Sequence, residues 1–195
     1  MIMLVFLLGG YPMLLFYVLF LLPIVAAVSA LLYVPFAIRT RRRLGNKGAL
    51  YHLARFALVG CVLSLVYLTL LWYFPDITFH PAHHFLNLRP FVWVTQCYDM
   101  GFRRMIRQLL LNVAMFIPLG FLLPVTAEKA RKGWVTVSIV LLSTLAIETL
   151  QFFLGRSADI DDVIMNTLGG VIGYGVFRLA NRAFRGQAWW EQMLG

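Results

Sequence analysis

Long apolar stretches constrain the fold of this chain more than any other feature of its sequence. A membrane-spanning helix needs about 20 consecutive, mostly apolar residues, and hydrophobic residues make up 61% of the 195 positions. Stretches of suitable length cover residues 14–38, 50–74, 108–127, 134–154 and 163–180. We therefore predict an all-α fold, a polytopic membrane bundle of about five transmembrane helices.

The first apolar stretch, residues 1–38, leaves the number of its spans open. It lacks a basic start and is much longer than the apolar region of a signal peptide, about 7–15 residues. Gly9, Gly10 and Pro12 interrupt it. We predict one span preceded by an apolar extension, with two short spans as the alternative.

The distribution of basic residues predicts the orientation. Alternate threading places residues 39–55, residues 128–133 and the C-terminal tail on one side, with twelve of the seventeen Lys and Arg residues. Because cytoplasmic loops are enriched in Lys and Arg, we predict an outside N-terminus and a cytoplasmic C-terminus. The same bias explains the net charge of +9, so no nucleic-acid partner is predicted. The predicted units are residues 1–80 with two spans, 85–180 with three spans, and a cytoplasmic tail at 181–195.

Polar residues at bilayer depth mark the candidate site. A charge at the centre of a membrane helix costs roughly 2.5–3.5 kcal/mol, so such residues should face one another, water or a ligand. Near the outer ends of spans three to five lie Asn112, Glu148, Gln151, Arg156, Asp159, Asp162 and Asn166. At about 1.5 Å of rise per residue, those within the spans fall at a common level in the outer leaflet.

Residue spacing predicts which members of this set share one face of a helix. Asp159, Asp162 and Asn166 are three and four residues apart and form one stripe if the segment is helical. Asp161 falls off the stripe, and we expect it to face solvent. Asp159 directly precedes the expected helix start, where its carboxylate can cap the first turn.

Three interpretations of the set remain open. As a structural clamp, its amides and Glu148 would hold the helices together through hydrogen bonds. As an outward-facing pocket, the set would bind a lipid headgroup or another amphipathic ligand, with Arg156 paired to Glu148 or Asp159. As a catalytic site, Glu148 would be the general acid or base, with Asp159 and Asp162 as oxygen ligands. Because no Ser-His-Asp set, phosphate-binding glycine loop or HExxH motif is present, we predict no cofactor and no metal.

A histidine group in the segment after the second span has the residue types of a zinc site. His80, His83 and His84 lack a fourth ligand at an obvious spacing, and Pro81 disfavours a regular helix there. We predict a solvated loop.

An amphipathic stretch precedes the third span. Residues 101–111 carry apolar side chains on one stripe and Arg103, Arg104 and Arg107 on the other. We predict a short interfacial helix whose arginines contact lipid phosphate, with recognition of a particular anionic ligand as the alternative.

Glycine and proline inside the spans predict local geometry. Gly169 and Gly173 form a small-xxx-small pair, which lets two helix backbones approach closely. Pro118 and Gly120 predict a kink or local unwinding of the third span.

Three of these motifs together form a pattern that is typical of one protein family. The motifs are the run 111–124 (Leu-Asn-Val-Ala-Met-Phe-Ile-Pro-Leu-Gly-Phe-Leu-Leu-Pro), the pair Glu148-x-x-Gln151, and the polar and glycine-rich segment 156–173. Together they resemble the VanZ-like family of small multi-span bacterial membrane proteins, and Asn-Leu-Arg-Pro-Phe at 87–91 resembles an upstream element of that family. Arg89 stands where an apolar residue is usual.

The resemblance implies a place in the cell envelope, at the outer face of the bacterial cytoplasmic membrane. The family is named for a protein associated with reduced susceptibility to teicoplanin, a lipoglycopeptide that inserts its acyl chain into the membrane. The resemblance does not imply an enzymatic activity.

The favoured functional prediction is an outward-facing pocket that binds an amphipathic envelope ligand: a lipid headgroup, a lipid-linked intermediate or a lipoglycopeptide. Membrane lipids are the other expected partners. The alternative is a membrane enzyme that modifies a lipid-phosphate or glycolipid by carboxylate or metal-assisted chemistry. A transporter is the least supported class, because no inverted repeat is visible.

Overall fold

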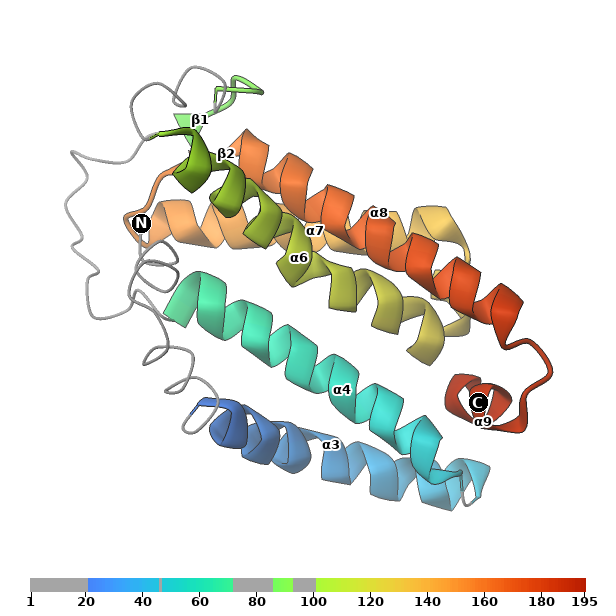
Figure 1. The fold of residues 1–195 in the computed structure, drawn as a ribbon. Helices are drawn as coiled ribbons and strands as arrows, with labels where there is room; N and C mark the ends of the chain where they lie inside the picture. The colour runs from blue at the N-terminus through green and yellow to red at the C-terminus, as the bar shows by residue number, and fades with distance from the viewer. Residues whose placement is uncertain (1–20, 46, 72–85, 93–100) are drawn as a thin grey trace.

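The computed structural model describes residues 21–45, 47–71, 86–92 and 101–195. The long helices are α3 (Leu22–Leu44), α4 (Ala49–Val66), α6 (Phe102–Thr126), α7 (Gly133–Phe153) and α8 (Ile160–Ala183). The shorter elements are the π-helical η2 (Tyr67–Leu71), the 3-10 helix η5 (Glu128–Arg131), α9 (Ala188–Leu194) and the strands β1 (Leu86–Asn87) and β2 (Ala158–Asp159). The long helices form an elongated bundle with the strand pair at one end and α9 at the other (Figure 1).

Five helices within the described ranges are long and apolar enough to cross a membrane. They cover Leu22–Arg42, Ala49–Leu70, Met105–Thr126, Gly133–Phe153 and Ile160–Ala183. The predicted all-α polytopic bundle is therefore confirmed. The orientation of the two termini stays a prediction, and the choice between one and two spans in residues 1–38 rests on positions outside the described ranges.

Close contact between α6 and α8 depends on glycine. A Cβ atom at Gly169 would overlap the carbonyl oxygen of Val113, and one at Gly173 would overlap that of Ile117. Both acceptors belong to α6, so the two backbones meet without intervening side chains. This is the close approach that the small-xxx-small pair predicts.

The third span stays helical throughout, so the predicted local unwinding is wrong, whereas the alternative of a kink stays a prediction. Helix α6 is continuous through Pro118 and Pro124. A proline removes only one backbone donor, and the bilayer offers no water to compete for the remaining hydrogen bonds. Gly120 serves packing instead, because a Cβ there would overlap the carbonyl group of Gly170.

The arginine-rich stretch before the third span does not form a separate interfacial helix. Helix α6 begins at Phe102 and continues into the span without a break. Met105 is buried in the bundle, whereas Phe102 and Leu110 are exposed. Some apolar residues of this stretch therefore face the protein, and others face its surroundings.

The C-terminal segment packs back onto the bundle. Trp190 and Leu194 of α9 are buried in a cluster with Ala54, Val125 and Phe177. α9 therefore closes the end of the bundle opposite the strand pair (Figure 1).

Candidate functional site

A polar cluster lies at the end of the bundle where β1 and β2 pair. The helix ends that meet there are the last turn of α4–η2, the first half of α6, the last turns of α7 and the first turns of α8. We call the following residues the polar cluster: Thr69, Asn87, Asn112, Thr144, Glu148, Gln151, Arg156, Asp159, Asp161, Asp162 and Asn166.

The deepest contacts of the cluster join three helices. Asn166 Nδ2 on α8 donates to Thr144 Oγ1 on α7 over 2.9 Å. Asn112 Nδ2 on α6 donates to Asp162 Oδ1 on α8. Thr144 and Asn166 are both buried, so the structure brings together the polar residues of spans three, four and five.

Glu148 points into the protein and not toward the acyl-chain region. Its side chain is only 6% exposed, and its Oε2 accepts a hydrogen bond from the backbone N–H of Asp159 over 3.0 Å. Asp159 is the N-cap of α8, with Oδ1 accepting from the N–H of Asp161 over 2.9 Å. The helix cap predicted from the sequence is therefore present, and Glu148 holds the residue that provides it.

Asp161 is buried, and the prediction that it faces solvent is wrong. Its side chain is 4% exposed, and Oδ1 accepts from the N–H of Phe91 over 2.7 Å. Among the described residues, Oδ2 is buried without a hydrogen-bond partner. A helical-wheel argument misplaces this residue because it considers only α8 and not the chain that covers it.

The covering segment is residues 86–92. Leu86 and Asn87 pair in parallel with Ala158 and Asp159, just before α8 begins. The side chain of Asn87 strengthens the junction, with Nδ2 donating to Asp159 Oδ1 over 3.0 Å. This long-range pairing places Phe91 above the first turn of α8.

The carbonyl oxygen of Thr69 joins the second span to the cluster. Gln151 Nε2 donates to it over 3.0 Å and Arg156 Nη1 over 2.7 Å. Thr69 lies in η2, the π-helical continuation of α4. This contact was not predicted, because the partner expected for Arg156 was Glu148 or Asp159.

Acidic side chains outnumber basic ones in the polar cluster. Four carboxylates, Glu148, Asp159, Asp161 and Asp162, gather near one guanidinium, Arg156. The positive end of the α8 dipole offsets part of this negative charge. The arrangement suits an ammonium group or several hydroxyl donors better than an anion.

Metal binding receives no geometric support from the described part of the chain. No three His, Cys, Asp or Glu residues in these ranges are placed to hold a metal ion. His80, His83 and His84 lie outside the described residues.

The arginines at the start of α6 lie near the same end of the bundle. Arg103 is exposed and Arg107 is partly buried, while the side chain of Arg104 lies outside the described part. Their contact with lipid phosphate stays a prediction.

Five membrane-capable helices in the described ranges and a buried polar cluster define a multi-pass membrane protein with a polar centre at one end. The family model of VanZ/LLP1 matches residues 55–181. The chain belongs to the VanZ/LLP1 family, and the resemblance inferred from its motifs is confirmed. It is also 35% identical over 130 residues to Protein VanZ of Enterococcus faecium, a match that covers 62% of this chain and 74% of that protein. No solved structure matches the chain.

Proposed function

We propose that this bacterial membrane protein binds an amphipathic cell-envelope molecule with the polar part of the ligand at the polar cluster. The observation that carries the proposal is Asp161 Oδ2, a buried carboxylate oxygen without a hydrogen-bond partner among the described residues. Leaving such an oxygen unsatisfied is unfavourable. This unused acceptor, together with the neighbouring carboxylates, favours a ligand that brings hydrogen-bond donors to the cluster.

The contacts support a division of roles within the polar cluster. The amides of Asn112, Gln151 and Asn166 each donate to a protein group, so they hold the helices in place. Ligand contacts then fall to the carboxylates, and Glu148 is tied to the α7–α8 junction through the N–H of Asp159. The proposed ligand therefore presents an ammonium or hydroxyl groups, and Arg156 can complement an anionic group of the same molecule.

The membrane setting and the family support an envelope ligand. The cluster lies at the end of membrane-capable helices, where a bound molecule can keep its acyl chain in the bilayer. A lipid headgroup, a lipid-linked intermediate or a lipoglycopeptide combines such a polar part with an acyl chain. Similarity to Protein VanZ makes teicoplanin the first probe to use, and binding would link this chain to glycopeptide resistance.

The test compares Glu148→Gln with the wild type. Glutamine keeps an oxygen that can accept from the N–H of Asp159 but removes the negative charge. We expect teicoplanin to bind the purified variant in nanodiscs about tenfold more weakly, the equivalent of roughly 1.4 kcal/mol. Protection of a susceptible host from teicoplanin should fall in parallel, while membrane protein level and Tm stay close to the wild type.

Thr149→Val is the matched control, because Thr149 is exposed on the same helix and bonds only to the carbonyl of Leu145 among the described residues. An unchanged affinity in Glu148→Gln would contradict the proposal. So would a loss of folded protein that accounts for the lost binding, which would support a purely structural clamp. Turnover of an envelope lipid that disappears in Asp159→Asn would identify a membrane enzyme instead.

A further inference from the structure

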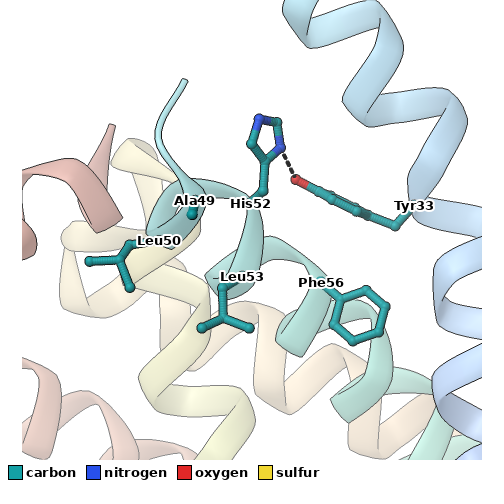
Figure 2. A pocket seen from close by; sticks show the side chains of 6 residues that line it. All are labelled: Tyr33, Ala49, Leu50, His52, Leu53 and Phe56. Atoms are coloured by element: carbon teal, nitrogen blue, oxygen red, sulfur yellow. Dashed lines mark hydrogen bonds between the residues drawn. The ribbon is translucent and has the colours of Figure 1, made fainter. Parts of the chain in front are cut away.

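A hollow of the molecule lies away from the polar cluster, between α3 and α4. It has a volume of about 470 Å³ and is lined by Tyr33, Ala49, Leu50, His52, Leu53 and Phe56. Figure 2 shows Tyr33 reaching across from α3 toward the first turns of α4, which carry the other five residues. We call this hollow the α3–α4 groove.

The lining of the groove is apolar except for one hydrogen-bonded pair. The hydroxyl of Tyr33 and Nδ1 of His52 are 2.7 Å apart (Figure 2). The other ring nitrogen of His52 has no hydrogen-bond partner among the described residues, so it can bond an ester or phosphate oxygen. Leu53 is 58% exposed, so a bound chain would cover it.

Basic residues follow the groove along α3. Arg39, Arg41 and Arg42 are exposed on the last turns of α3. They lie six to nine residues beyond Tyr33, which corresponds to about 9–14 Å along the helix. No Asp or Glu occurs in residues 21–71, so nothing within this hairpin neutralises the three arginines.

Two further basic residues of the hairpin have protein contacts. Lys47 lies over the ring of Tyr51, and so does the guanidinium of Arg55. Arg55 also donates to the carbonyl of Thr126 over 3.0 Å and to that of Met193 over 3.3 Å. Among the described residues of the hairpin, the exposed positive charge is therefore concentrated on the end of α3.

We propose that the α3–α4 groove binds one anionic phospholipid. An acyl chain lies along Leu53 and Phe56, the Tyr33–His52 pair meets the ester region, and the phosphate lies at the level of the exposed arginines at the end of α3. A zwitterionic lipid fits less well, because its ammonium group finds no acidic partner in the hairpin. Basic pockets between membrane helices are a known mode of anionic-lipid recognition.

The experiment uses the purified full chain in nanodiscs containing equal amounts of phosphatidylglycerol and phosphatidylcholine with identical acyl chains. Native mass spectrometry of the released protein counts the lipids that remain bound. We expect phosphatidylglycerol to be retained about tenfold more than phosphatidylcholine. Arg41→Gln/Arg42→Gln should bring the two lipids to nearly equal retention, and Leu53→Trp should displace both by filling the groove.

Arg182→Gln/Arg185→Gln is the matched control. It removes two exposed arginines from the C-terminal end of α8 and the segment after it, and we expect it to keep the preference. Tm and monodispersity establish that each variant is folded. Cysteine accessibility establishes that Arg41→Gln/Arg42→Gln keeps the orientation of the parent.

A photoreactive acyl chain on phosphatidylglycerol locates the bound lipid. Crosslinks within residues 49–56 support the proposal. It is overturned by equal retention of the two lipids in the wild type, by an equal loss of preference in the control, or by crosslinks confined to other segments.

Discussion

The α6–α8 unit and the α3–α4 hairpin are held together in different ways. Within the first, backbones touch at Gly169 and Gly173, and buried amides bond across the helices. Within the second, α3 packs chiefly against α4, and much of its surface is exposed, with Leu31 at 74%. One hydrogen bond, between Tyr33 and His52, crosses the hairpin in the described residues.

This difference shows which part of the molecule must keep a fixed geometry. Lipid chains are as apolar as leucine, so burying leucine between two membrane helices provides little driving force for association. Close backbone packing and interhelical hydrogen bonds provide it instead. The unit that carries the polar cluster has both, whereas the hairpin leaves space that a lipid can fill.

The largest expected effect tests backbone contact in the α6–α8 unit. Gly173→Ala places a methyl group against the carbonyl of Ile117, and overpacking of this kind lowers stability by about 2 kcal/mol. Gly175→Ala, two residues away, meets no atom within 4 Å and should stabilise α8 by up to about 1 kcal/mol. Unfolding in mixed micelles measures both. Equal stability of the two variants would show that the close approach is not needed.

A smaller effect tests the buried hydrogen bonds. Thr144→Val keeps the shape of the side chain but removes the oxygen that accepts from Asn166, so it should lower stability by about 1 kcal/mol. Thr149→Val on the same helix removes only a bond to its own turn and should change stability little. A loss in Thr149→Val as large as that in Thr144→Val would assign the effect to helix propensity.

The smallest effect is expected in the hairpin. Tyr33→Phe removes the bond to His52, and we expect a stability change of only about 0.5 kcal/mol, near the average for interhelical bonds in membranes. The same unfolding assay measures it. A loss larger than that of Thr144→Val would reverse the comparison and make the hairpin the more rigid part.

The sequence was sufficient for the features that depend on local chain properties. Apolar length predicted the membrane helices, and the spacing of Gly169 and Gly173 predicted the tight helix pair. The position of Asp159 before a helix start predicted its cap. Each of these follows from residues close together in the chain.

The missed features depend on distant segments. Asp161 is buried because residues 86–92 return to cover it, and no helical periodicity contains that information. Thr144 was missed because a threonine in an apolar helix usually bonds to its own backbone, so its role appears only once Asn166 faces it.

The acceptor that links Gln151 and Arg156 to the second span is a main-chain atom, the carbonyl of Thr69. Every amino acid carries a main-chain carbonyl, so substitutions at position 69 leave both hydrogen bonds in place. Related proteins are free to vary there while retaining the two donors. The contact is therefore better tested by replacing Gln151 and Arg156 together. Amide-proton exchange around Thr69 then reports whether the second span has become less protected.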